Sequence, residues 1–232
     1  MEYQEFAKYY DTFYQKKDYQ KEVNFLKHFI SINDKIIDIG CGTAIHASLL
    51  EQDNYQIDGL DLNIEMLNIA RTRLKGNLYH QNILNIDLNN QYNIIISMFA
   101  VINHLKDMNE LTKALSNFSK ILLPDGKIII DLHNPQSSGT KTDSYNNIIR
   151  TMTWNYDVSS HIAKSEITFI IDNQIYQDSH IFRIFTIDEV ISCLNNLDLE
   201  VSNIYENYNL EKNGNQSSKN LQFVIKKRVK TK

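Results

Sequence analysis

A glycine-rich turn between an apolar strand and a helix constrains the fold of this chain more than any other feature. The stretch Ile36–His46 reads Ile-Ile-Asp-Ile-Gly-Cys-Gly-Thr-Ala-Ile-His. Its first residues form a short β-branched run, which predicts a buried parallel strand. Gly40 and Gly42 permit positive φ and let a ligand approach the backbone closely. Since the helix that follows directs free N–H groups into the same space, the stretch predicts a nucleotide-type binding corner.

The residues around this turn disfavour two common nucleotide classes. A dinucleotide fingerprint needs a third glycine where Ile45 stands, and a phosphate-binding P-loop needs a Gly-Lys-Ser/Thr run that does not follow. Asp38, two residues before Gly40, would repel a pyrophosphate but suits a cationic ligand such as S-adenosylmethionine, which carries a sulfonium and an ammonium group. The stretch Ile36–Ala44 therefore resembles motif I of class I S-adenosylmethionine-dependent methyltransferases. An ordinary strand-turn-helix corner of another α/β protein remains the alternative at this point.

Composition narrows the class of protein further. A length of 232 residues is sufficient for one α/β domain with a sizeable core, and a net charge of −4 argues against a nucleic-acid partner. Cys41 and Cys193 are too few for a disulfide framework, which favours a reducing, cytoplasmic compartment. The first residues match neither a signal nor a transit peptide, and no apolar run has the length of a membrane span.

Strand and helix patterns alternate along most of the chain. Apolar runs end near Asp61, His80, Met98 and His133, and amphipathic helical patterns separate most of these runs. This order matches the class I methyltransferase plan over nearly the whole chain. The resemblance implies a Rossmann-like α/β fold with a seven-stranded, mainly parallel sheet and one antiparallel strand near its edge.

Three parts of the chain are expected. Residues 1–30 would form an N-terminal helical lid, although their tyrosine-rich pattern equally fits an amphipathic helix packed on the domain. Residues 31–144 and 186–232 would form the S-adenosylmethionine-binding Rossmann-like domain. Residues 145–185 show short β-like runs without a helical period, so we expect a small antiparallel β insertion of about three strands. This insertion would cover the acceptor site, form a dimer contact, or both.

Local patterns predict several shorter features. Residues 20–30 have a helical period, residues 123–126 form a turn, and residues 134–142 and 211–220 are expected to be loops. Thr186 and Glu189 predict a capping box at the start of a helix.

Asp61 is the second acid that points to a cofactor. It ends the second predicted strand about 20 residues after the glycine turn, where an acid binds ribose hydroxyls in doubly wound folds. In the alternative interpretation, Asp61 or Asn63 is simply the N-cap of the following helix. Position and resemblance together predict these S-adenosylmethionine contacts: Tyr19, Asp38, Gly40, Cys41, Gly42, Asp61, Leu62, Met66, Asn82, Ile83 and Met98. Met66 fits a core position better than a ligand contact, although it lies close to the predicted adenine.

Several stretches resemble a narrower group, the N,N-dimethyltransferases that act on nucleotide-linked amino sugars. These stretches are Tyr10–Tyr14, Leu78–Gln81, Ser97–Lys106 and the run that begins at His180. The resemblance implies a small amine acceptor and an N-methyl product. The outline is shared with glycine-type and other small-molecule methyltransferases.

Three departures from the family pattern bear on the site. Ala44 stands where the family usually has a third glycine, and its methyl group narrows the approach to the methionine moiety. Asn82 stands where an aspartate usually accepts from the adenine amine, which an amide oxygen can still do. Asn103 and His104 replace a small and an aromatic residue, so the acceptor can differ from that of the resembled enzymes.

The candidate acceptor contacts are Tyr14, by resemblance, and His104 and His133, by their positions after the fourth and fifth predicted strands. A histidine can take a proton from an amine near neutral pH. His180 fits a structural role better, and no metal motif is found. The leading hypothesis is a small-molecule N-methyltransferase, with a possible homodimer. The alternatives are an O-methyltransferase and a non-catalytic S-adenosylmethionine-binding module.

Overall fold

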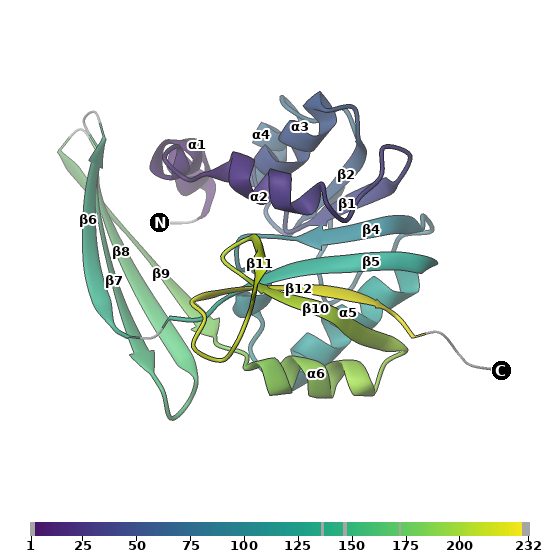
Figure 1. Cartoon of the computed structure of the whole chain (residues 1–232). Coiled ribbons are helices and arrows are strands. Elements are labelled where there is room, and N and C mark those ends of the chain that lie inside the picture. The colour runs from purple at the N-terminus through teal and green to yellow at the C-terminus, as the bar shows by residue number, and fades with distance from the viewer. Residues whose placement is uncertain (1–2, 136, 146–147, 172, 229–232) are drawn as a thin grey trace.

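The chain forms two β-sheets, one central and one lateral, in the computed structural model shown in Figure 1. The structure describes residues 3–135, 137–145, 148–171 and 173–228. The central sheet has eight strands in the order β11-β10-β12-β5-β4-β1-β2-β3, and the lateral sheet has four in the order β6-β7-β8-β9. The predicted α/β Rossmann-like fold class is confirmed.

The central sheet is parallel from β3 through β5, and β12 runs antiparallel to both of its neighbours, β5 and β10. The mainly parallel sheet with an antiparallel strand near its edge agrees with the prediction, and β11 adds an eighth strand to the expected seven. Its strands are β1 (Lys35–Ile39), β2 (Gln56–Asp61), β3 (Leu78–His80), β4 (Tyr92–Ser97), β5 (Leu122–His133), β10 (Leu199–Glu206), β11 (Asn209–Asn213) and β12 (Asn220–Lys227).

Helices cover both faces of this sheet (Figure 1). α2, α3 and α4 lie on one face, and α5 and α6 on the other. The helices are α1 (Tyr3–Tyr14), α2 (Tyr19–Leu26), α3 (Ile45–Gln52), α4 (Ile64–Ala70), α5 (Met108–Ile121) and α6 (Ile187–Asn195), with a short 3₁₀ helix η1 (Val101–His104). The capping box expected at Thr186 and Glu189 is present at the start of α6.

Alternation along the strands explains the two cores. Ile37 and Ile39 of β1 face the helices α5 and α6, whereas Ile36 faces α2 and α3. Strands β4 and β5 divide their isoleucines between the faces in the same way. A strand buried on both faces needs a continuous apolar run, which is what identifies these strands in the sequence.

The lateral sheet is larger than predicted. Its strands are β6 (Gly139–Tyr145), β7 (Ile148–Asp157), β8 (Ile162–Ile171) and β9 (Gln174–Arg183), all paired antiparallel. It begins at Gly139, inside the stretch 134–142 that the sequence indicated as a loop. The strand β6 is polar because it is an edge strand, and its threonines bond across to β7: Thr140 Oγ1 lies 3.1 Å from Thr153 Oγ1, and Thr142 Oγ1 lies 3.0 Å from Thr151 Oγ1.

Two further predictions of local structure were wrong. Asn209–Asn213 forms β11, an eighth strand paired with β10, where the loop 211–220 was expected to begin. The expected turn at 123–126 lies within β5, and the pairing of β5 with β4 shifts register there. Polar or turn-forming residues are tolerated in both places because β11 pairs on one side only and β5 is out of register with β4 at residues 123–126.

Helix α1 lies between the lateral sheet and the central domain (Figure 1). The Phe13 ring packs on Phe169 of β8 with centroids 4.5 Å apart. On its other side, the Asp11 carboxylate pairs with Arg73 and accepts a hydrogen bond of 2.7 Å from Thr43 Oγ1 in the glycine turn. The N-terminal helix therefore joins both sheets beside the binding corner.

Candidate donor and acceptor site

A cavity of about 820 Å³ opens at the carboxyl ends of β1, β2 and β4. This is where ligands bind in open α/β sheets. Eleven of the fourteen residues predicted for the site line the cavity, and their roles remain predictions: Tyr19, Gly40, Cys41, Gly42, Asp61, Leu62, Met66, Asn82, Ile83, Met98 and His104. Tyr14, Asp38 and His133 do not line it.

The glycine turn forms the floor of the cavity. Gly40 has φ +77°, and a Cβ at this residue would lie 2.5 Å from Cγ2 of Val101. Gly42 has φ +54° and nothing within 4 Å of the position of a Cβ, so its missing side chain leaves open space. The two glycines therefore have different reasons to be there: Gly40 allows η1 to pack closely, and Gly42 exposes backbone to a ligand.

Ala44 occupies a left-handed position at the start of α3. Its φ is 61° and its ψ is 37°, and it is fully buried in the core that faces α2 and α3. A residue with a Cβ is strained there by about 1–2 kcal/mol. The departure from the family's third glycine therefore adds local strain in the backbone that shapes the cavity.

Asp61 connects the two motifs of the binding corner. Its Oδ2 accepts the backbone N–H of Gly42 at 2.8 Å, and its Oδ1 accepts the N–H of Asn63 at 2.8 Å. Burial raises the pKa of Asp61, although these N–H groups favour the carboxylate. Asn63 is the N-cap of α4, so the alternative N-cap role of Asp61 is wrong. Each carboxylate oxygen retains a lone pair for a ligand hydroxyl.

Asp38 lies beneath the glycine turn and does not line the cavity. It is 2% exposed, and its Oδ2 has no hydrogen-bond partner among the described residues. Burial is the largest cause that raises the pKa of Asp38 to about 7, and Asp61 and Asp131 raise it further while His46 lowers it. A direct contact of Asp38 with the methionine moiety remains a prediction.

The other end of the cavity is apolar and suits an aromatic ring. Leu62 is 62% exposed at the end of β2, and Ile83 and Met66 lie across the same cavity. The Oδ1 atom of Asn82 accepts the N–H of Leu84 at 2.8 Å, which fixes the amide in a turn. Met66 lines this wall and also belongs to a small core with Phe169, so its core role is present and its ligand contact stays a prediction.

A buried charged cluster at the entrance of α2 was missed by sequence reasoning. Glu22 Oε2 lies 2.6 Å from Nε2 of His46 and also pairs with Lys17. The Tyr19 ring packs edge-on against His46 with centroids 5.1 Å apart, and the Tyr19 hydroxyl is buried without a partner among the described residues. An acid on the apolar face of the predicted helix 20–30 was the available signal for this cluster.

Two consecutive left-handed residues follow β4 at the cavity wall. Phe99 has φ 67° and Ala100 has φ 60°. The Asp131 carboxylate, buried at the end of β5, accepts the N–H of Ala100 at 2.6 Å and pairs with the Tyr208 hydroxyl. Such strain persists only where the surroundings hold it, and it is concentrated at functional sites.

Tyr14 lies behind the cavity wall. Its ring meets Phe99 edge-on with centroids 4.9 Å apart, and the Arg150 guanidinium of β7 lies 5.3 Å from its centre. Burial raises the pKa of Tyr14 above its ordinary value, so the hydroxyl stays protonated. Tyr14 thus contacts both the cavity wall and the lateral sheet from α1. Its predicted contact with an acceptor requires Phe99 or α1 to move.

His133 is excluded from the cavity by the geometry of its strand. The ring is exposed at the end of β5, and its Nδ1 lies 3.1 Å from Oδ1 of Asn220 on the neighbouring strand β12. Its position after a parallel strand was correct, but strand alternation directs its ring elsewhere. His133 therefore does not line the cavity, and its contact with an acceptor stays a prediction.

His104 is the histidine that the structure places on the cavity wall beside the lateral sheet. Its ring lies 4.8 Å from Phe182 and 6.0 Å from His180, centroid to centroid, both on β9. Desolvation and the nearby His180 lower the pKa of His104 below its ordinary value. The imidazole is therefore neutral near pH 7, and its unprotonated nitrogen can accept a hydrogen bond.

The residues of the cavity fit S-adenosylmethionine. The open space at Gly42, the unpartnered hydroxyl of Tyr19 and the carboxylate of Asp61 are polar positions on the cavity wall that a cationic, hydroxyl-bearing ligand can use. The apolar end at Leu62 suits its adenine. No group of three or more metal-ligating side chains is found within the described ranges.

A family model described as "Methyltransferase domain" matches residues 10–202. The chain belongs to this methyltransferase family. The prediction of a class I S-adenosylmethionine-dependent methyltransferase is thereby confirmed at the level of the family and its cofactor.

Curated relatives agree with this methyltransferase assignment. The chain is 31% identical over 134 residues to a dTDP-3-amino-3,6-dideoxy-alpha-D-glucopyranose N,N-dimethyltransferase of Streptomyces fradiae, a match covering 55% of this chain and 52% of the relative. It is 29% identical to a dTDP-3-amino-3,4,6-trideoxy-alpha-D-glucopyranose N,N-dimethyltransferase of Streptomyces venezuelae, covering 54% and 56%. The chain thus spans about half the length of the curated relatives it matches.

Solved structures of methyltransferases share the fold over nearly the whole chain. A S-adenosylmethionine-dependent methyltransferase from Clostridium acetobutylicum superimposes with a TM-score of 0.84 at 19% identity, covering 98% of this methyltransferase and 99% of that chain. Among the described residues, no helix is both long and apolar enough to cross a membrane.

Proposed function

We propose that this methyltransferase transfers a methyl group from S-adenosylmethionine to the amine of a small molecule, with an amino sugar as the first class to test. The observation that carries the proposal is the neutral imidazole of His104 on the wall of the donor cavity. The amino-sugar N,N-dimethyltransferase names of two relatives support the acceptor class.

S-adenosylmethionine, when bound, supplies a methyl group on an already activated sulfonium. The protein therefore needs chiefly to align donor and acceptor and to exclude water, and positioning of this kind can be worth roughly 7–11 kcal/mol. Asp61 would hold the ribose hydroxyls, Gly42 would offer backbone, and Leu62 and Ile83 would enclose the adenine.

The acceptor amine must be neutral to attack. His104 lies where its neutral imidazole can accept a hydrogen bond from the amine and orient it. Since its pKa of about 4 makes it a weak base, the proton that the amine loses goes to water. The lateral sheet, through Phe182 and His180 beside His104, would form the far wall of the acceptor site. This assigns the sheet a covering role, with the lid α1 closing the side.

The experiment combines donor titration with acceptor turnover. Calorimetry with S-adenosylmethionine, S-adenosylhomocysteine and NAD should give micromolar binding of the first two only. Mass spectrometry of reactions with dTDP-linked 3-amino sugars, simple amines, hydroxy compounds and carboxylic acids should then show +14 mass products on amines. Methylation on oxygen alone would favour the O-methyltransferase, and tight donor binding without any product would favour the non-catalytic module.

The proposal also covers the compartment and the oligomeric state. Cys41 and Cys193 are both free and buried, which supports a reducing compartment such as the cytoplasm. A homodimer through the exposed outer face of the lateral sheet, which carries Ile149, Ile175 and Ile181, is proposed as an addition to the covering role.

A further inference from the structure

One buried amide joins three segments that are far apart in the sequence. Asn103 of η1 is fully buried. Its Nδ2 donates to the carbonyl of His133 at 3.1 Å and to the carbonyl of Arg183 at 2.8 Å, and its Oδ1 accepts the N–H of His133 at 2.8 Å. Both amide hydrogens are therefore used, and one side chain bonds η1 to the ends of β5 and β9.

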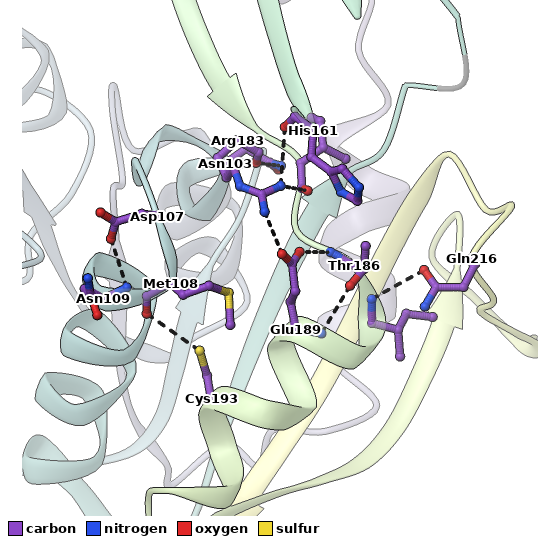
Figure 2. A network of polar contacts seen from close by, with 12 residues as sticks. Asn103, Asp107, Met108, Asn109, His161, Arg183, Thr186, Glu189, Cys193 and Gln216 are labelled. Atoms are coloured by element: carbon purple, nitrogen blue, oxygen red, sulfur yellow. Dashed lines mark hydrogen bonds and ion pairs between the residues drawn. The ribbon is translucent and has the colours of Figure 1, made fainter. Parts of the chain in front are cut away.

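The end of β9 is itself fixed to the central domain. The Arg183 guanidinium donates to the carbonyl of Ile184 at 2.6 Å and pairs with Glu189 of α6 at 2.5 Å, as Figure 2 shows. The second oxygen of Glu189 accepts the N–H of Thr186 in the capping box. The carbonyl that Asn103 binds thus belongs to a residue anchored from two sides.

The residues next to these bonded atoms meet at the cavity. His104 follows Asn103, and Phe182 precedes Arg183; their rings lie 4.8 Å apart, centroid to centroid. The hydrogen bond from Asn103 to the Arg183 carbonyl therefore sets the separation between His104 and the wall of the lateral sheet. Without that bond, η1 and β9 would move apart, and the proposed acceptor site between them would become wider.

We propose that Asn103 is a positioning residue that holds His104 against β9 and so fixes the width of the acceptor site. The role rests on the proposed function only in that the acceptor lies beside His104. The donor contacts at Gly42 and Asp61 share no hydrogen bond with Asn103, so donor binding is separable from this role.

The test compares Asn103→Ala and Asn103→Ser with Tyr92→Phe as a matched control. Tyr92 is fully buried at the opposite end of β4, where its hydroxyl donates to Asp58 at 2.8 Å, so its variant also loses a buried hydrogen bond. We expect Asn103→Ala to keep donor affinity within about threefold and to lower acceptor kcat/KM at least tenfold. Asn103→Ser should fall between Asn103→Ala and wild type, and Tyr92→Phe should match wild type.

A second readout needs no acceptor. The His104 imidazole is titrated by NMR on ¹⁵N-histidine-labelled protein, with its signal identified by its loss in His104→Gln. His180, Lys106 and Glu110 are the titratable groups near this ring or on the same cavity wall. In Asn103→Ala the pKa of His104 should rise toward its ordinary value as the ring leaves β9, whereas Tyr92→Phe should leave it unchanged.

The outcomes separate this inference from the proposed function. If no acceptor is methylated but the pKa of His104 rises in Asn103→Ala, the positioning role stands and the function fails. If melting temperature falls while the titration and acceptor kinetics stay as in wild type, Asn103 is merely structural and the inference is overturned. If Asn103→Ala does not fold, Arg183→Gln replaces it, because it removes the anchor that holds the end of β9 to Glu189. This variant must also lower acceptor kcat/KM and raise the pKa of His104.

Discussion

The Asp61 carboxylate accepts the backbone N–H of Gly42 at 2.8 Å, which joins the end of β2 to the glycine turn after β1. The bond holds the turn open toward the cavity and orients the carboxylate that we assign to the ribose hydroxyls. The two motifs recognised separately in the sequence are therefore one structural unit. A change at either residue should alter the donor site.

Asp61→Ala should weaken S-adenosylmethionine binding at least about 100-fold, because two hydrogen bonds to a charged acceptor, each worth about 1.5–3 kcal/mol, are lost. Isothermal titration measures the affinity. Asp107→Ala is the control, since Asp107 also accepts two backbone N–H groups, both at 2.9 Å, but lies outside the cavity. Near-native donor affinity of the Asp61 variant would exclude the ribose role.

Asp38 should make the ligand-free protein less stable as pH rises. Its folded-state pKa of about 7 lies above the unfolded value of about 3.9, so between these values the folded protein binds more protons. Stability from this group is full below about pH 4 and is lost as pH rises through 7, by a total on the order of 4 kcal/mol. Urea unfolding from pH 4.5 to 8 should show a shallower decline for Asp38→Asn; equal slopes would refute the assignment.

Ala44→Gly should change stability by less than about 1 kcal/mol. Glycine relieves about 1–2 kcal/mol of left-handed strain but loses about 0.8 kcal/mol of buried methyl and adds unfolded-state entropy worth about 0.4–1 kcal/mol. Ala44→Val should destabilise by more than about 2 kcal/mol, because a β-branched residue suits neither the positive φ nor the packed site. Chemical denaturation of both variants checks the order, and a tolerated valine would contradict it.

Asp131→Ala should destabilise the protein by about 1–3 kcal/mol, since the N–H of Ala100 and the Tyr208 hydroxyl lose their partner in a buried place. Asp131→Asn should cost less because its amide oxygen can still accept from Ala100. Thermal unfolding gives the ranking. We also expect weaker donor binding in the alanine variant, since the strained Phe99–Ala100 turn at the cavity wall loses its support.

Most of the residues that line the cavity could be predicted from the sequence because their signals are local. Gly40, Gly42 and Asp61 follow strands at fixed short intervals, and backbone geometry carries them to one edge of the sheet. The acceptor side depends on contacts between distant segments. Nothing near His133 indicates that Asn103 and Asn220 bind it, and nothing near Asp131 indicates that it supports Ala100.

The strands that sequence reasoning missed are edge strands. Gly139–Tyr145 and Asn209–Asn213 each pair on one side, so they lack the apolar run of a central strand. Edge strands carry polar residues that keep them from pairing with other chains. The same polar residues are typical of loops, so these strands were predicted as loops. The same reasoning explains why the eighth strand of the central sheet was not expected.

The lateral sheet leaves the central domain after His133 and returns at Arg183, and the Asn103 amide binds both residues. The insert therefore has its entry and exit side by side, at one edge of an otherwise self-contained fold. A segment connected in this way can lengthen, shorten or be replaced over generations without changing the order of the central strands. If the lateral sheet covers the acceptor as proposed, replacing this segment with that of a relative should change the range of acceptors and leave the glycine turn and Asp61 intact.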